Sequence, residues 1–374
     1  MLRLPIRIYS FFRKNTVMTV AFLAAVITSF IVTPDKEYLG YFDLKTLACL
    51  FSVLAVVCAL RNIKFFTILA RKIVKCFGTV RMTLLALIYI TFIGSMLIAN
   101  DMALLTFLPL GYFVLSSTGM QKYMAVTFIM QNIAANLGGM LTPFGNPQNL
   151  YLYSRFNIPT TEFVKVMFPP FMVAIVLITA ICLFFPNEKM KLEDEDETKL
   201  PPLRTVIYLV LFALSIAIVF RTIPYYIGLV IILVSMLFLD RDALKKVDYP
   251  LLLTFTCFFV FSGNMGRIEA VRAFFSSFLE IDTLLFSAMS CQFISNVPSA
   301  ILLSQFTENW QSLLVGVNIG GAGTLIASLA SLITFSEYQL HDPRGTKKYI
   351  GLFSAFNFGF LIVLYLFSHF VQGV

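Results

Sequence analysis

The chain has 374 residues, of which 59% are hydrophobic and 13% charged, and its formal net charge is +8. Soluble domains average about 45–50% apolar and about 25% charged residues, so this composition excludes an ordinary soluble protein and indicates one embedded in a lipid bilayer. An excess of Lys and Arg is typical of cytoplasmic loops in membrane proteins, and we expect no nucleic-acid partner. Six scattered cysteines without a CxxC pair and two isolated histidines predict neither a disulfide framework nor a zinc site, and we expect no cofactor.

A basic amphipathic stretch of fourteen residues opens the chain. It leads into the first apolar run without an A-x-A cleavage site, which predicts a retained helix. A transmembrane helix needs about 20 apolar residues, and several of the runs that follow are shorter. The runs lie at 17–33, 43–60, 82–98, 102–117, 122–138, 148–154, 164–185, 205–220, 225–239, 250–262, 283–294, 299–306, 311–319, 325–335 and 349–371.

The short runs can be accommodated in pairs. The arms 82–98 and 102–117 predict a re-entrant hairpin, 82–117, with Asn100 and Asp101 at its tip. The segment 283–306 predicts a second hairpin with Ser295 and Asn296 at its tip, and 122–154 and 311–335 predict two helices that are each broken in the middle. Non-helical backbone at this depth is tolerated only where it is buried in protein or lines a wet cavity.

The two broken helices carry the same polar sequence. Residues 136–142 read N-L-G-G-M-L-T and residues 318–324 read N-I-G-G-A-G-T, with four of seven positions identical. Paired interruptions in two halves are typical of transporters whose binding site is formed by discontinuous helices. We therefore predict an all-α polytopic membrane protein of two inverted-topology repeats, each with a re-entrant helical hairpin and a broken transmembrane helix. The first repeat is assigned to 1–185, a charged cytoplasmic linker to 186–204, and the second repeat to 205–374.

The distribution of basic residues predicts the orientation. If the N-terminus is cytoplasmic, hairpins do not cross and broken helices cross once, then 21 of the 28 Lys and Arg residues lie inside. This three-to-one bias is the one expected of membrane proteins. Because the scheme has nine crossings, the C-terminus is predicted to be external to the cell membrane.

Asp101 is the acidic residue set deepest in apolar sequence. Its insertion into a bilayer costs about 2.5–3.5 kcal/mol, which favours a function such as holding sodium or a proton. The alternative is a helix cap, and the two roles are compatible. Asn100 and Asn296 occupy equivalent tips, where an amide offers a carbonyl oxygen to a cation and an N–H to an anion. A sodium site is predicted at Asn100, Asp101 and Asn296.

The broken helices supply the remaining candidates for substrate or ion binding. Glycines let the backbone unwind and approach a ligand, freed carbonyls can bind a cation, and the start of a half-helix can face an anion. Together with Ser295, the candidates are Asn136, Gly139, Thr142, Gly145 and Asn146 in the first half, and Asn318, Gly321, Thr324 and Ser328 in the second.

These motifs resemble the ion transporter superfamily, which includes citrate transporters, divalent anion–sodium symporters, arsenite permeases and NhaD-type sodium/proton antiporters. The resemblance rests on A-N-D-M-A-L-L-T, N-L-G-G-M-L-T-P-F-G-N-P-Q-N, I-S-N-V-P-S-A and N-I-G-G-A-G-T. It implies an elevator-type secondary transporter, often a homodimer, with substrate and coupling ions held between hairpin tips and broken helices. The tips depart from the paired S-N-T of the symporters, and A-N-D leans towards the arsenite-permease and antiporter branches.

We therefore predict a secondary active transporter for a small anion, a di- or tricarboxylate, coupled to sodium or protons. A sodium/proton antiporter or an arsenite-like oxyanion efflux permease is the alternative. The sequence has no HExxH, GxSxG or paired membrane aspartates, so we do not predict an enzyme.

Overall fold

The computed structural model describes residues 15–189 and 199–374. These residues are almost entirely helical, and among them the only β-structure is one isolated bridge between Thr79 and Lys189. The predicted N-terminal amphipathic segment and the middle of the charged linker lie outside the described residues. The predicted all-helical class is confirmed.

The chain up to the linker forms a series of helices with short connections. They are α2 (Thr16–Ile31), η1 (Lys36–Tyr41), α3 (Leu44–Asn62), α4 (Phe65–Lys75), α5 (Val80–Ile98), α6 (Asn100–Ser117), η2 (Gln121–Tyr123), α7 (Met124–Gly138), η3 (Gly139–Leu141), α8 (Pro147–Arg155) and α9 (Thr160–Cys182).

The chain after the linker repeats much of this order. Its elements are α10 (Pro202–Val219), α11 (Tyr225–Leu239), α12 (Arg241–Lys245), α13 (Tyr249–Arg267), α14 (Glu269–Ile281), α15 (Thr283–Ile294), α16 (Asn296–Leu303), α17 (Trp310–Ile319), α18 (Leu329–His341), η4 (Pro343–Gly345), α19 (Thr346–Phe367) and η5 (Ser368–Gln372).

Within the described residues, seven helical segments are long and apolar enough to cross a membrane. They comprise α3, α5, α7 with its flanking turns, α9, α10, α13 and α19 with its flanking turns, whereas α2, α11 and α15 are apolar but shorter. An integral membrane protein is therefore confirmed. The nine-crossing scheme and the positions of the termini stay predictions.

Capping side chains fix where several helices begin. Asp43 Oδ1 accepts the N–H of Thr46 at the start of α3 (2.9 Å), and Asp248 Oδ1 accepts that of Leu251 at the start of α13 (3.0 Å). Such a side chain satisfies a backbone donor that the first helical turn leaves unpaired. The two caps occupy corresponding places in the two halves, because α3 and α13 each precede an amphipathic helix, a hairpin and a broken helix.

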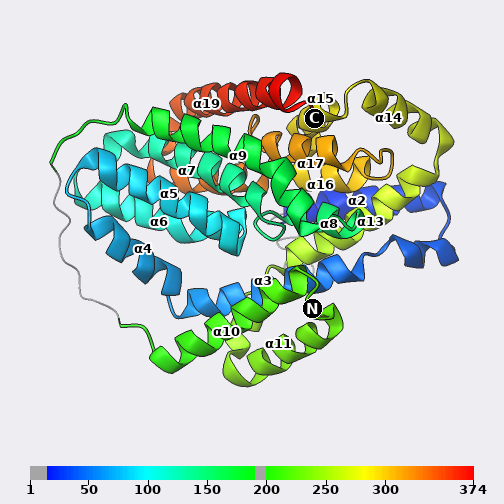
Figure 1. Cartoon of the computed structure of the whole chain (residues 1–374), viewed down its shortest axis with the longest axis horizontal. Coiled ribbons are helices and arrows are strands. Elements are labelled where there is room, and N and C mark those ends of the chain that lie inside the picture. The colour runs from blue at the N-terminus through cyan, green and yellow to red at the C-terminus, as the bar shows by residue number, and fades with distance from the viewer. Residues whose placement is uncertain (1–14, 190–198) are drawn as a thin grey trace, which may run out of the picture.

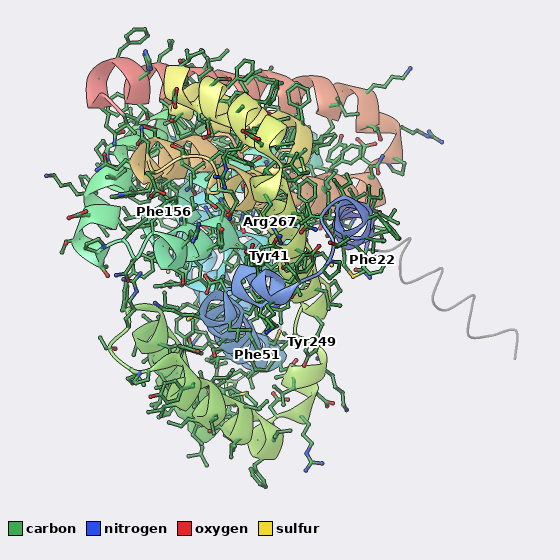
Figure 2. The ribbon with its side chains drawn as sticks, turned by 90° about the vertical axis from the view of Figure 1, so that its right-hand side faces the viewer. Phe22, Tyr41, Phe51, Phe156, Tyr249 and Arg267 are labelled. Atoms are coloured by element: carbon green, nitrogen blue, oxygen red, sulfur yellow. The ribbon has the colours of Figure 1, made fainter. Side chains whose placement is uncertain are left out.

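The helices form two groups. The peripheral group consists of α2, α3, α10, α11 and α13, in which α2 packs on α13, and α10 and α11 pack on α3. The central group consists of α5 to α9 and α15 to α19, and α4 and α14 connect the two groups. Figure 1 shows the α5–α6 hairpin on the left and the α15–α16 hairpin on the right, with α10 and α11 below. Figure 2 shows α2, marked by Phe22, at the edge of the molecule.

Helix contacts recur with the roles of the two halves exchanged. The helix α2 packs on α13 as α11 packs on α3, and α6 packs on α18 as α16 packs on α8. Likewise α7 contacts α19, and α17 contacts α9. Two repeats related by a two-fold axis are expected to give this reciprocal pattern. The inverted orientation of the repeats in a membrane stays a prediction.

Candidate functional site

Each hairpin turns at a single residue with an unusual backbone conformation. Ala99 has φ 65° and ψ 148°, and Ser295 has φ 74° and ψ 159°. Residues other than glycine rarely adopt this region, and doing so costs about 1–3 kcal/mol. The same costly turn at both tips indicates that the surrounding structure enforces it.

The predicted tip residues prove to be helical. We expected Asn100 and Asp101 to lie between the arms, but α6 begins at Asn100, and α16 begins at Asn296 rather than at residue 299. The reason is a local hydrogen bond: Asn100 Oδ1 accepts the N–H of Asp101, and Asn296 Oδ1 accepts the N–H of Val297, each at 2.9 Å. Each asparagine thereby satisfies a donor of the helix that it starts.

Each tip is also bonded to the break in its own half. The N–H of Asn100 donates to Gly145 O (3.0 Å), and the N–H of Asn296 donates to Ala327 O (2.9 Å). These acceptors immediately precede the N-cap residues of the helices that resume each broken segment, α8 and α18. The carbonyls of the breaks are therefore used in part to hold the hairpins.

The threonines of the duplicated motif fasten the breaks to the first arm of each hairpin. Thr142 Oγ1 donates to Met96 O (2.8 Å) and Thr324 Oγ1 donates to Gln292 O (3.0 Å). Both acceptors lie three residues before the tip residue in the sequence. The structure thus gives the two predicted threonines bonds to a hairpin rather than a place in the lining of the central cavity described below.

The glycines of the motif allow close approach of the chain to polar side chains. A Cβ placed on Gly139 would lie 2.3 Å from Asn146 Oδ1, and one on Gly145 would lie 2.3 Å from Gly139 O. A Cβ on Gly321 would lie 3.2 Å from Asn296 Nδ2. The first two contacts are too short for any side chain, so glycine is required there by packing.

Asparagines of the motif bridge the two halves. Asn136 Nδ2 donates to Ser328 Oγ (3.1 Å), while Asn136 Oδ1 accepts from Asn100 Nδ2 (3.1 Å). In the reciprocal place, Asn146 Nδ2 donates to Asn318 Oδ1 (3.0 Å). All five side chains are buried. They form one network that connects the first tip to both breaks.

A central cavity of about 550 Å³ opens beside this network. On the side of the central group, its polar lining comes from both tips, namely Asn100, Asp101, Ser295 and Asn296, together with Gln148 of α8. The opposite wall is formed by α2 and α13 and is mostly apolar, including Val20 and Phe258, with Thr16 and Thr254 as its polar members. The cavity therefore lies between the central group and the peripheral group of helices.

Four helix N-termini of the central group meet at this cavity, opposite the start of α2 at Thr16. The helices α6, α8, α16 and α18 begin at Asn100, Pro147, Asn296 and Leu329, and all four residues line it. The start of a helix carries a partial positive charge and unpaired N–H groups. Four such ends around one cavity create an environment that favours an anion.

Three buried oxygen atoms near the first tip have no hydrogen-bond donor among the described residues. They are Asp101 Oδ1, Asn146 Oδ1 and Gln148 Oε1. A buried acceptor without a partner costs about 1–3 kcal/mol, and more if it is charged. A bound cation or a proton would offset this cost. The described residues contain no group of three His, Cys, Asp or Glu side chains that could hold a metal ion.

Two further residues belong to the site although their sequence did not single them out. Asp248, the cap of α13, lines a small pocket of about 20 Å³ with Asp101, among Leu50, Val53 and Leu251. Gln292 Nε2 donates to Gly320 O (2.9 Å) and Ala322 O (3.2 Å) in the second break. Asp248 lies outside the apolar runs, and no sequence pattern relates it to Asp101. Gln292 could have been noticed as an amide four residues before Asn296.

Thus four predicted residues, Asn100, Asp101, Ser295 and Asn296, line the central cavity. The others lie behind it in the bonded network and in the glycine contacts. The family model for citrate transporters matches residues 8–309. The chain belongs to the citrate transporter family.

Its relatives are membrane proteins of similar length. The chain is 34% identical over 305 residues to an uncharacterized transporter of Methanocaldococcus jannaschii, covering 81% of this chain and 83% of the relative. It is 29% identical over 314 residues to the inner membrane protein YbiR of Escherichia coli, covering 81% and 82%. The crystal structure of the Alcanivorax borkumensis YdaH transporter superposes with a TM-score of 0.52 at 11% identity, covering 95% and 97%. That likeness supports the fold, and the family supports a membrane transporter rather than an enzyme.

Proposed function

We propose that the protein is a secondary active transporter that carries a small anion, a di- or tricarboxylate, in symport with sodium or protons. The observation that carries this proposal is the meeting of two hairpin tips and four helix N-termini at one cavity. An anion would occupy the central cavity, where the N-termini of α6, α8, α16 and α18 provide partial positive charge.

The coupling ion would lie towards the first tip. Asp101 Oδ1, Asn146 Oδ1 and Gln148 Oε1 are buried acceptors that lack donors among the described residues. A cation there would satisfy these oxygens and offset the charge of an anion in the neighbouring cavity. Cation and anion would therefore stabilise each other, which is the basis of symport.

The position of the cavity supports an elevator mechanism. The tips belong to the central group of helices, whereas Val20 and Phe258 belong to the peripheral group. We propose that the two groups are the moving and the static parts of two inverted repeats, with a cytoplasmic N-terminus and an external C-terminus. A homodimer, which the resemblance implies, would anchor the static part.

A specific feature favours the alternative, a sodium/proton antiporter or an oxyanion efflux permease. Asp101 follows the first tip asparagine, and an acid at this place can exchange a proton for sodium without any anion. The proposal and the alternative differ in whether an anion moves with the cation.

Uptake into proteoliposomes tests the proposal. Labelled citrate, succinate, sulfate and arsenite would be offered under an imposed sodium gradient, an imposed proton gradient, or neither. Symport predicts accumulation of a carboxylate only under one of the gradients. Sodium-driven proton movement without uptake of any anion would support the antiporter instead, and accumulation of arsenite alone would support the oxyanion carrier.

A further inference from the structure

A second cavity lies between the two groups of helices, separate from the central cavity. It has a volume of about 380 Å³ and we call it the vestibule. Its walls come from the η1–α3 connection, the middle of α13, the end of α8 and Gln305. Two basic residues, Lys45 and Arg155, line it, and Asp43 is its one acidic residue.

The charges of the vestibule are not balanced. Lys45 and Arg155 form no ion pair with any residue that the structure describes. Asp43 acts electrostatically on Lys45 without a direct contact, and its carboxylate accepts the N–H of Thr46 (2.9 Å) and the Thr46 hydroxyl group. Arg221 lies just behind, because its guanidinium stacks over the Tyr153 ring of α8 at 4.2 Å and acts electrostatically on Lys45. The vestibule thus keeps an excess of positive charge.

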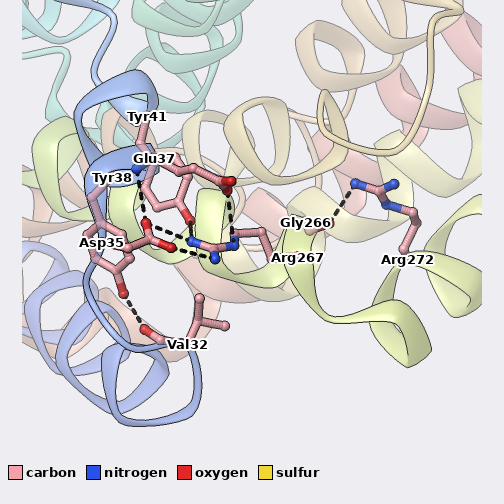
Figure 3. A network of polar contacts seen from close by, with 8 residues as sticks. All are labelled: Val32, Asp35, Glu37, Tyr38, Tyr41, Gly266, Arg267 and Arg272. Carbon is pink, nitrogen blue, oxygen red and sulfur yellow. Dashed lines mark hydrogen bonds and ion pairs between the residues drawn. The ribbon is translucent and has the colours of Figure 1, made fainter.

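Arg267, which contacts the wall of the vestibule, differs from Lys45 and Arg155 because it has acidic partners. Arg267 Nη2 lies 2.7 Å from Asp35 Oδ2 and its Nε lies 3.4 Å from Glu37 Oε2 (Figure 3). Its Nη1 also donates to Tyr41 Oη (3.2 Å), and Tyr41 forms part of the vestibule wall. Acids therefore neutralise Arg267 and the contact fixes the wall, while the two cations inside the vestibule have no such partner.

In the proposed orientation, the basic residues of the vestibule lie on the external side of the membrane, where such residues are few. The crossing scheme puts only seven of 28 basic residues on the external side, namely Lys36, Lys45, Arg155, Lys165, Arg221, Arg267 and Arg272. External loops of membrane proteins tend to avoid Lys and Arg. Three of the seven nevertheless lie together, Lys45 and Arg155 in the vestibule and Arg221 just behind it. Their positive field would raise the local concentration of an anion.

The vestibule also lies close to the central cavity along α8. Tyr151 lines the vestibule and Gln148 lines the central cavity. Three helical residues correspond to a rise of about 4.5 Å. Ser154 supplies a hydroxyl group on the vestibule side of the same helix.

We propose that the vestibule is an external capture site for small carboxylates or oxyanions, held by Lys45 and Arg155 before they enter the central cavity. The inference rests on the proposed anion transport and orientation, which it extends by a second binding site and two specificity residues. It predicts that the charge of the vestibule raises the rate of anion capture, and that ionic strength screens this effect.

A thiol placed in the vestibule tests the charge and the side together. Ser154→Cys would be introduced in a Cys76→Ser background, since Cys76 is the exposed cysteine among the described residues. Intact cells would be treated with membrane-impermeant methanethiosulfonate reagents of negative or positive charge. We expect the negative reagent to react about tenfold faster at low ionic strength than the positive one, after correction for their rates with free thiol.

Variants then assign the effect to the two cations. Lys45→Gln with Arg155→Gln should abolish the preference for the negative reagent, and Lys45→Gln alone should reduce it more than Lys165→Gln, an external charge that does not line the vestibule. Citrate or sulfate should slow labelling in the parent and leave the double variant unaffected. Equal rates for both reagents, or an unchanged preference in the double variant, would overturn the inference.

Transport separates this inference from the proposed function. The double variant should raise the substrate concentration for half-maximal uptake about tenfold while the maximal rate stays within about twofold. If no anion is transported by the parent but labelling shows the preference and anion protection, the vestibule stands and the proposed symport fails. Labelling only from the cytoplasmic side would overturn the external assignment.

Discussion

The two hairpin tips share one backbone and differ in one side chain. Both turn at a residue with positive φ, both start a helix with an asparagine, and both are bonded to the break of their own half. After the asparagine, however, the first tip has Asp101 and the second has Val297. The shared backbone and asparagine position both tips in the same way. The chemical difference between the two tips therefore lies in the residue after the asparagine.

The breaks differ in the same direction. Ser328 caps α18 by accepting the N–H of Ser331 (3.2 Å), whereas the equivalent Asn146 makes no side-chain cap for α8 and its Oδ1 has no donor among the described residues. In the second break the side-chain oxygen of Ser328 is hydrogen-bonded within the protein. In the first break the side-chain oxygens of Asn146 and Gln148 have no donor among the described residues. In the proposed symport, this asymmetry would favour a cation near the first tip and leave the central cavity between the tips to the anion.

The largest expected effect comes from removing the acid. Asp101→Asn should lower gradient-driven uptake roughly 100-fold or more, because a buried cation would lose its charged partner. Uptake into proteoliposomes measures this, with Val297→Asn as the matched change at the second tip. We expect Val297→Asn to keep the ion dependence. Wild-type rate and ion dependence in Asp101→Asn would reduce Asp101 to a helix cap.

Placing an acid at the second tip tests whether the two environments differ. Val297→Asp should destabilise the protein by about 2.5–3.5 kcal/mol, because the second half offers no spare cation site. Thermal unfolding in detergent measures this, with Val297→Leu as the control of similar size. A stable Val297→Asp variant would mean that the second tip is as able to hold an acid as the first.

A smaller effect is expected in the breaks. Asn146→Ala should weaken the apparent affinity for the coupling ion at least about tenfold, because it removes a proposed ligand oxygen, and losing even a residue that only supports a metal ligand typically costs about 10- to 100-fold. Ser328→Ala should leave that affinity unchanged, because its hydroxyl group is used within the protein. Ion-dependent uptake compares the two variants, and equal affinities would remove Asn146 from the proposed cation site.

The smallest effect should be the same in both halves. Thr142→Val and Thr324→Val each remove one hydrogen bond to a hairpin arm, from Met96 O and Gln292 O respectively. Each should cost about 1 kcal/mol of stability with little change in transport. Thermal unfolding checks the pair. A large loss in only one variant would show that the hairpins are held differently.

The sequence predicted the broken helices and hairpins because glycine pairs, asparagines and prolines are poor residues for a membrane helix. The start of α6 was misplaced because Ala99 adopts a conformation that alanine rarely takes, and no local pattern announces this. Asn100 was therefore assigned to a loop instead of to the first position of a helix.

Contacts between the halves were beyond prediction from a single sequence. The duplicated motif indicated that Asn136 and Asn318 are equivalent, yet it did not indicate that each would bond to the helix cap residue of the other half, Ser328 or Asn146. Asp248 is similar: it reads as an ordinary helix cap, and only the fold brings it into one pocket with Asp101. Such through-space pairs depend on packing rather than on spacing along the chain.

The central claim is that an anion and a cation bind cooperatively. Thermal stability measured with both ligands tests this claim most directly. The thermal stability of purified protein would be measured with citrate, succinate, sulfate and arsenite, at several pH values, with and without sodium. We predict that one anion stabilises the wild type by about 2.7 kcal/mol at 100 times its Kd, only with sodium or at low pH, and that Asp101→Asn loses this dependence. Stabilisation that is independent of sodium and pH, or that is unchanged in Asp101→Asn, would contradict the account.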